Sequence, residues 1–207
     1  YSLVCKDLGT VYETLNVDKK PYPCCRSTHC GIEAALRLRE EHSIDPAQIE
    51  FATIYTYLVG LKQCGFSDSS KEPHAATEAK FSTPYLAATG NVGLSDFSVE
   101  AINDPARQAL LKKITIAEDP VFTSRYPSHW GCRTVVTLTN GQTFQTEVID
   151  ASGSVEAPLS SKQMLSKALS CCAAYPADAM KALVESVLNL ETCSALPDIS
   201  CFDPTNA

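Results

Sequence analysis

The sequence predicts an α+β fold, with a small mixed sheet and helices followed by two helices at the C-terminal end. The segment Ile49–Val59 is rich in β-branched and aromatic residues, which is typical of a strand. Residues 132–149 form two alternating segments around Asn140-Gly141, the pair that a tight type I′ hairpin turn favours. Residues 29–42 repeat apolar side chains at the spacing of an amphipathic helix.

Two further helices are predicted within the α+β part. Residues 78–90 indicate a short helix with Pro84 near its first turn, where the missing N–H costs little. Residues 103–114 indicate a helix in which Asp104 is the N-cap and Pro105 the first helical residue.

The C-terminal part predicts two helices of its own. Residues 160–175 begin with Ser160 and Gln163 at the spacing of a capping box, and residues 177–190 form the second helix. The polar residues 62–77 are predicted to be a loop.

These elements suggest three parts: a leading segment at 1–17, an α+β domain at 18–157 and C-terminal helices at 158–207. Two helices alone bury little apolar surface. We therefore expect them to dock on the α+β domain, on another chain, or on a part of the protein outside this sequence. The sequence starts at Tyr1 rather than at methionine, so we expect translation to begin elsewhere.

Composition excludes several classes of protein. The 207 residues carry a net charge of −7 and contain no basic run, which argues against a nucleic-acid partner. No stretch approaches the roughly 18 to 20 apolar residues that span a bilayer, and the first residues lack the pattern of a signal peptide. We expect a protein that does not enter the membrane.

Ten cysteines are present, and most lie in apolar patterns. Cys132 opens a strand-like run, and Cys171 and Cys172 lie in a helix-like one. Buried free cysteine behaves as a small hydrophobic residue. We therefore expect a reducing, intracellular location, in the cytoplasm or in mitochondria.

The stretch KKPYPCCRSTHC, residues 19–30, concentrates charge, cysteine and proline. Its cysteine spacing, C-C-x4-C, lacks the C-x2-C pairs of structural zinc sites, so no metal is expected. Pro21 and Pro23 stiffen the loop. A local group of basic residues before a helix N-terminus can attract an anion even in an acidic protein.

An ordered series of motifs resembles the MmgE/PrpD family. The series is KPYPCC at 20–25, EAKFSTPY at 78–85, VGLSDF at 92–97, DP at 104–105, LTNGQTF at 138–144 and APLSSKQMLSKALSCCA at 157–173. The resemblance extends from about Leu8 to Leu190, nearly the whole chain.

This resemblance implies a fold and a chemistry. Members of the family have an all-helical domain and a smaller α+β lid, with the active site in the cleft between them, and they are commonly dimeric. This chain would supply the lid and the returning C-terminal helices, whereas an N-terminal helical domain would carry the general base. The implied reaction needs no cofactor: a proton is removed next to a carboxylate of a small di- or tricarboxylate, and elimination follows.

The resemblance also implies two catalytic candidates. Lys20 matches the family lysine that faces the cleft, where a cation stabilises the negative charge that proton removal creates. His29 lies at the start of the helix beyond the loop and is the second candidate, although a structural histidine is the more frequent outcome there.

Substrate carboxylates are expected to contact residues of two motifs. These candidates are Lys80, Ser82 and Tyr85 in the second motif, and Cys25 and Arg26 in the first. Lysine and arginine supply charge, and a serine hydroxyl supplies a hydrogen-bond donor. We expect Lys20, Lys80 and Ser82 to share one concave surface. No role is predicted for His74, His129 or Trp130.

Several alternatives remain open at this stage. Dehydration of a citrate-like substrate is favoured over cis-aconitate-type decarboxylation, because Cys25 stands where decarboxylases can carry histidine and a family tyrosine is missing near Gly60 and Leu61. Isomerisation or epimerisation would share the first step. A non-catalytic lid-like module and a cysteine-rich metal protein are the competing classes.

Overall fold

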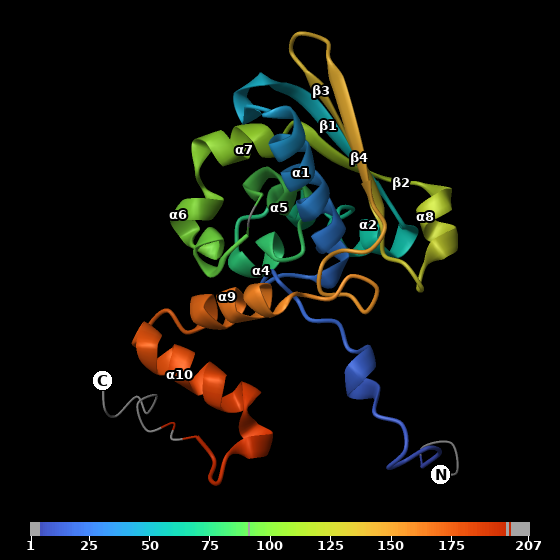
Figure 1. Cartoon of the computed structure of the whole chain (residues 1–207). Coiled ribbons are helices and arrows are strands. Elements are labelled where there is room, and N and C mark those ends of the chain that lie inside the picture. Colours follow the sequence, from blue (N-terminus) through green and yellow to red (C-terminus); the bar gives the residue numbers. More distant parts are fainter. Residues whose placement is uncertain (1–4, 91, 198, 200–207) are drawn as a thin grey trace. The chain divides into compact units, whose positions relative to one another are not determined.

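The computed structural model describes residues 5–90, 92–197 and 199 of the chain (Figure 1). The chain divides into two compact units, Tyr1–Pro158 and Leu159–Ala207. Residues 1–4, 91, 198 and 200–207 lie outside the described residues, and they include Tyr1 and Cys201.

A four-stranded mixed sheet forms the centre of the first unit, in the order β2–β1–β3–β4. Strand β1 (Ile49–Thr56) pairs in parallel with β2 (Ile114–Glu118) and antiparallel with β3 (Cys132–Leu138). Strand β4 (Thr143–Val148) is antiparallel to β3. A parallel pair needs a crossover connection, and the helical segment 57–113 supplies it. The predicted mixed α/β character and the hairpin are thus confirmed.

The turn of the hairpin differs from the predicted one. A type I′ turn needs positive φ at both central residues, but of Asn140 and Gly141 only Gly141 has it, at 86°. The Gly141 N–H donates to the Leu138 carbonyl at 2.8 Å, and the Leu138 N–H donates to the Gln142 carbonyl at 2.8 Å. This pattern is a type I turn followed by a one-residue bulge at glycine.

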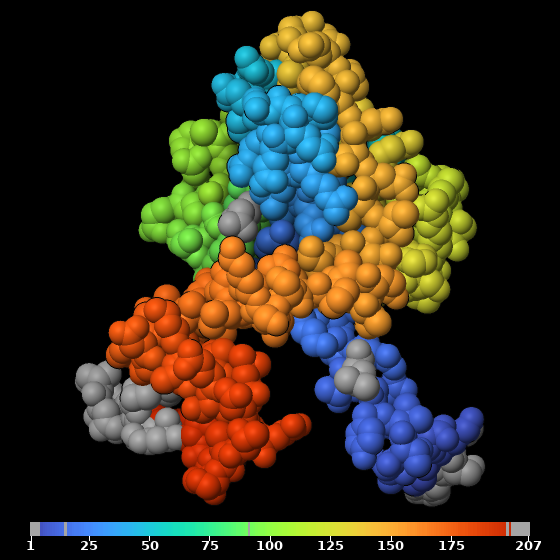
Figure 2. Space-filling view, viewed as in Figure 1, coloured from blue at the N-terminus to red at the C-terminus, as the bar shows by residue number. Residues whose placement is uncertain are grey.

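Helix α1 (His29–His42) covers one face of the sheet and packs on β3 and β4. Its bounds are those predicted from apolar spacing. Leu38 packs in one cluster with Ala52 of β1 and Val136 of β3, each of them buried. In the space-filling view the surfaces of α1 and of the hairpin lie side by side (Figure 2).

Shorter helices fill the crossover and the approach to the hairpin. They are α2 (Leu58–Cys64), α3 (Asp68–Lys71), α4 (Ala76–Ala79), α5 (Thr83–Thr89), the 3-10 turn η4 (Leu94–Phe97), α6 (Val99–Ile102), α7 (Pro105–Leu111) and α8 (Pro120–Arg125). Three more 3-10 turns precede β1: η1 (Glu13–Asn16), η2 (Arg26–Thr28) and η3 (Pro46–Gln48). The predicted cap of α7 is confirmed, because the Asp104 carboxylate accepts from the Arg107 N–H at 2.8 Å.

Two predicted boundaries are wrong. The strand predicted at Ile49–Val59 ends at Thr56, because helix α2 begins at Leu58. The helix predicted at 103–114 ends at Leu111, and Ile114 instead opens the unpredicted strand β2. At the first boundary a run of apolar residues continues from the strand into the helix, so composition alone conceals the change. At the second, the strand has only five residues and pairs with a distant part of the chain.

The region between α2 and α7 is also more helical than predicted. The predicted loop at 62–77 contains the end of α2, all of α3 and the start of α4. The helix predicted at 78–90 is divided into α4 and α5. Pro84 lies in the first turn of α5, as expected, and the Ser82 hydroxyl caps that helix by accepting from the Tyr85 N–H.

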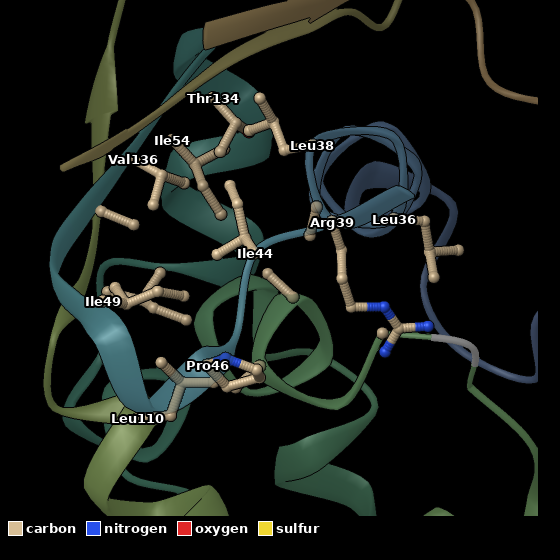
Figure 3. A pocket seen from close by; sticks show the side chains of 16 residues that line it. Leu36, Leu38, Arg39, Ile44, Pro46, Ile49, Ile54, Leu110, Thr134 and Val136 are labelled. Atoms are coloured by element: carbon tan, nitrogen blue, oxygen red, sulfur yellow. The ribbon is translucent and has the colours of Figure 1, made fainter. Parts of the chain in front are cut away.

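A small apolar void lies between α1, the sheet, α5 and α7 (Figure 3). Its volume is about 70 Å³, and Leu38, Ile44, Ile54 and Val136 face one another across it. Of its lining residues only Arg39 is charged. Such a void suits no polycarboxylate, and it is best described as imperfect packing of the core.

The second unit contains α9 (Ser161–Cys171), α10 (Ala177–Leu188) and the 3-10 turn η5 (Leu190–Thr192). The predicted capping box is confirmed, since the Ser160 hydroxyl accepts from the Gln163 N–H and the Gln163 side chain accepts from the Ser160 N–H. The two helices contact each other.

We expect Gly65→Ala to destabilise the first unit. A methyl group at Gly65 would overlap the Ile116 side chain in β2, and overpacking of this kind costs about 1–3 kcal/mol in the free energy of unfolding. Chemical denaturation of the protein measures the change. Gly93→Ala is the matched control, because the nearest atom to its added methyl group would be 3.7 Å away. Equal stability of the two variants would contradict the packing described here.

Candidate functional site

The candidate site is built around residues 18–28, here called the lysine loop. The Lys19 N–H donates to the Gly153 carbonyl at 2.7 Å. Gly153 has a φ of 87°, and a Cβ atom there would overlap the Lys19 carbonyl oxygen. Only glycine satisfies both conditions, so Gly153 lets the two backbones lie in direct contact.

Arg26 fastens the lysine loop to the same turn. Its guanidinium donates to the Ala151 carbonyl at 2.9 Å and to the Ser152 carbonyl at 3.1 Å, and its Nε donates to the Asp18 carboxylate at 2.8 Å. The side chain of Arg26 is only 12% exposed. An arginine whose donors are used in this way positions the loop, and few of its N–H groups remain to bind a ligand.

His29 lies in the interior beneath this clamp. Its side chain is fully buried, and its Nδ1 lies 2.9 Å from Nη1 of Arg26. Because arginine can only donate, Nδ1 accepts and the proton of a neutral imidazole is on Nε2. The ring of Tyr22 meets His29 edge to face at 5.2 Å. This geometry supports a structural role for His29 rather than contact with a substrate.

Lys20 lies at an open hollow of about 450 Å³, here called the lysine hollow. The lining residues are Asn16, Val17, Asp18, Lys20, Arg26, Cys30, Pro127, Ser128, Trp130, Asp150, Ala151, Ser154, Val155 and Glu156. Lys20 is exposed and makes no hydrogen bond or ion pair with any described residue. Its ammonium group is therefore available to an anion.

A histidine–aspartate pair borders the hollow, and Asp150 is the member of the pair that lines it. His129 Nδ1 lies 2.9 and 3.0 Å from the two carboxylate oxygens of Asp150, and the side chain of His129 is 39% exposed. The carboxylate orients the imidazole and leaves Nε2 directed elsewhere. Trp130 stands beside the pair and stacks obliquely on Tyr126, at 5.5 Å between ring centroids. The pair thus fixes the position of one acidic side chain in the wall of the hollow.

Sequence reasoning missed the histidine–aspartate pair, but the hairpin contains the signal. Cys132 pairs with Val148 across β3 and β4. Continuing this antiparallel register outward brings the residues just before β3 opposite those just after β4. His129 and Asp150 occupy those positions.

The second predicted motif lies elsewhere. Ser82 is fully buried and donates to the Ser70 carbonyl, and the buried Tyr85 donates to the Asp96 carbonyl. Neither residue lines the lysine hollow, and neither does Lys80. The lysine hollow is therefore not a surface that Lys20 shares with Lys80 and Ser82, and the concave surface expected for these three residues stays a prediction.

Lys80 nevertheless lies beside the lysine loop. Its carbonyl accepts from the Cys25 N–H at 2.9 Å, and its half-buried side chain directs Nζ to within 5.3 Å of the Phe97 ring centroid. A cation over an aromatic face is stabilised there. The motifs at residues 20–25 and 78–85 thus contact each other through the backbone. The Lys20 side chain lies at the lysine hollow, whereas the Lys80 side chain lies over Phe97.

Cys25 is the one described cysteine whose thiol is made more acidic. Its pKa falls from 9.0 to about 6, first because the Cys64 thiol hydrogen-bonds to it, and further because of hydrogen bonds from Ser27 and the charge of Lys20, while burial opposes the shift. The same hydrogen bond, together with burial, raises the pKa of Cys64. Cys25 is partly exposed and Cys64 is fully buried.

Other kinds of site find no support in the described ranges. No group of three or more His, Cys, Asp or Glu side chains in residues 5–90, 92–197 and 199 is arranged to hold a metal ion. No helix in those ranges is long and apolar enough to cross a membrane.

Comparison with known proteins identifies the family. Residues 22–191 match the MmgE/PrpD C-terminal domain, a range that includes Arg26, the sheet and the histidine–aspartate pair. The chain belongs to the MmgE/PrpD family.

Among curated proteins, the chain is similar to cis-aconitate decarboxylase of Mus musculus. The two are 24% identical over 186 residues, which make up 86% of this chain and 38% of that relative. The chain thus spans well under half the length of the relative, and the match indicates a family that includes lyases.

We expect Gly153→Ala to loosen the lysine loop. The added methyl group would overlap Lys19, so the Lys19–Gly153 hydrogen bond and the Arg26 clamp should weaken, and amide hydrogen exchange at residues 19–26 should accelerate. Gly141→Ala is the control, because it has the same positive φ but nothing within 4 Å of its added methyl group. That variant should be destabilised only by the strain of an alanine at positive φ, about 1–2 kcal/mol in the free energy of unfolding. Unchanged exchange at residues 19–26 in Gly153→Ala would contradict the clamp.

We expect Cys25 to react with iodoacetamide at unusually low pH. The thiolate is the reactive form, so the alkylation rate should rise with a midpoint near pH 6, against about 8.5 for an ordinary thiol. Mass spectrometry of the peptide that contains Cys25 gives the rate, with N-acetylcysteine as the reference thiol. In Cys64→Ala the midpoint should move up towards the reference. A midpoint in the parent protein equal to that of N-acetylcysteine would disprove the thiol pair.

Proposed function

We propose that this chain is the lid-like part of a cofactor-independent lyase that acts on a small di- or tricarboxylate. The favoured reaction is dehydration of a citrate-like substrate, as in 2-methylcitrate dehydratases. Membership of the MmgE/PrpD family supports the class of reaction. The observation that carries the proposal is Lys20: an exposed cation without a partner among the described residues, on a clamped loop, at the edge of a hollow.

Lys20 has the chemistry that this reaction requires. Removal of a proton next to a carboxylate creates an enolate-like charge, and a cation held beside that charge stabilises it more than the ground state. The lysine loop is fixed at Lys19 and Arg26, on both sides of Lys20. The backbone at Lys20 is therefore already in place when the substrate arrives, and only the lysine side chain has to be ordered.

The lysine hollow fits a small polar molecule. Its volume of about 450 Å³ lies within the range typical of ligand sites. Three acidic side chains, Asp18, Asp150 and Glu156, line it, and Asp18 repels an anion less than a free carboxylate would because it is paired with Arg26. His129 is a candidate to transfer the proton that accompanies loss of water.

The remainder of the site would come from outside this chain. Because the chain covers 38% of the relative's length, we propose that an N-terminal helical domain supplies the general base and closes the hollow. The units that we propose to be the lid, residues 18–157, and the returning helices, residues 158–207, would both contact that domain. A homodimer is proposed on the resemblance to the family alone.

A second candidate is decarboxylation. The similarity to cis-aconitate decarboxylase favours it, whereas Cys25 in place of a histidine counts against it. Epimerisation or isomerisation would begin with the same proton removal. A lid-like module without activity is the remaining alternative if the chain acts without a helical domain.

The test is turnover by the full-length protein that contains this chain. Incubation with citrate, 2-methylcitrate or cis-aconitate, followed by NMR, should show loss of water from one of the first two, or of carbon dioxide from the third. Lys20→Ala should lower kcat/KM by about 10²-fold or more, as the loss of one charge-stabilising group typically does.

Lys19→Ala is the matched control. Lys19 is the neighbouring exposed lysine, and it holds the loop through its backbone rather than its side chain, so its replacement should change kcat/KM little. Full activity of Lys20→Ala would refute the role of Lys20. Absence of turnover by the parent protein with every polycarboxylate would favour the non-catalytic module.

A further inference from the structure

We propose that Cys25 and Cys64 form a peroxide-sensitive pair, in which Cys25 is the thiol that is oxidised and Cys64 the thiol that resolves it into a disulfide. This modification site is independent of the proposed lyase activity. It rests on the contact between the lysine loop and helix α2.

The two cysteines belong to segments that are joined directly. Cys25 is the N-cap of η2, and Cys64 is the last residue of α2. The Ser27 hydroxyl donates to the Gln63 side chain at 2.8 Å, which holds η2 against the end of α2. Cys25 lies two residues before Ser27 and Cys64 directly follows Gln63, so this contact brings the two cysteines near each other, and each thiol shifts the pKa of the other. A disulfide would bridge segments that already touch.

The surroundings of Cys25 favour its thiolate and admit an oxidant. The side chain is partly exposed, Lys20 contributes positive charge, and the Ser27 backbone N–H donates a hydrogen bond. A thiolate that is accessible and lies beside a second thiol is the usual arrangement of a redox-sensitive cysteine. Cys64 is shielded from solvent, so it should react only with oxidised Cys25.

The other described cysteines lack this combination. Cys24, Cys30 and Cys132 are buried, and burial raises the pKa of each thiol, which makes it less reactive. Cys5, Cys171 and Cys193 are exposed and Cys172 is partly exposed, but among the described residues none of these four thiols hydrogen-bonds to another thiol. Oxidation should therefore be selective for Cys25.

The reaction balances with hydrogen peroxide as the oxidant. The Cys25 thiolate attacks one peroxide oxygen and the O–O bond breaks, which gives a sulfenic acid and, after protonation, water. The Cys64 sulfur then attacks the Cys25 sulfur, the S–O bond breaks and a second water leaves. Cys25 and Cys64 each lose one electron overall, and peroxide accepts both. The negative charge of the thiolate next to Lys20 disappears in the first step.

The experiment treats the protein with hydrogen peroxide, blocks the remaining thiols, and maps peptides by mass spectrometry without reduction. We expect one cross-linked peptide pair that joins Cys25 to Cys64 and disappears with dithiothreitol. In Cys64→Ala the sulfenic acid should persist at Cys25, where dimedone traps it. Cys171→Ala is the control and should form the same cross-link as the parent protein.

Two results would overturn the proposal. One is a parent protein in which peroxide leaves Cys25 and Cys64 uncoupled while other cysteines react. The other is a cross-link from Cys25 to Cys24 or Cys30 in place of Cys64. Both are read from the parent protein, so a variant that fails to fold does not affect the conclusion. Neither depends on turnover of a polycarboxylate, so the lyase proposal can fail separately.

Discussion

The contact between the lysine loop and the turn at Gly153 is the constraint on which the candidate site depends. It is made mostly by the backbone: one amide of the loop and three carbonyls of residues 151–153, with Arg26 as the bridge. Hydrogen bonds from a charged donor each contribute about 1.5–3 kcal/mol. The arrangement joins the start of α1 to the end of the hairpin, two segments more than a hundred residues apart in the sequence.

Arg26 and Lys20 therefore have different roles in the lysine loop. Arg26 is nearly buried and shares its donors among carbonyls, Asp18 and His29. A planar guanidinium suits this, because it holds several acceptors at fixed angles. Lys20 has no such partners among the described residues and retains a compact, hydrated charge. The loop thus combines one cation that supplies rigidity with one that stays available, which is what the recognition of an anion requires.

Much of this architecture is visible in the sequence, but only where the signal is local. Apolar spacing gives the bounds of α1, and Asp104 and Ser160 give correct helix starts, because each depends on neighbours within one turn. Strand β2 was missed because its pairing with β1 is a long-range property. Ser82 and Tyr85 were predicted to bind substrate, yet their hydroxyls meet carbonyls that only the folded chain brings near. Lys20 was found through its motif. The pair of His129 and Asp150 was not, because the register of β3 and β4 brings the two residues together.

The hairpin is closed at both extremities, by the bulged turn at Gly141 and by the hydrogen bond between His129 and Asp150. A two-stranded ribbon normally frays from its open end, but here that end is fastened by a side-chain contact. Separation of β3 from β4 must first break this contact or begin within the ladder itself. The part of the hollow that Pro127, Ser128, Trp130 and Asp150 line is consequently held by the sheet, although these residues lie just outside the strands.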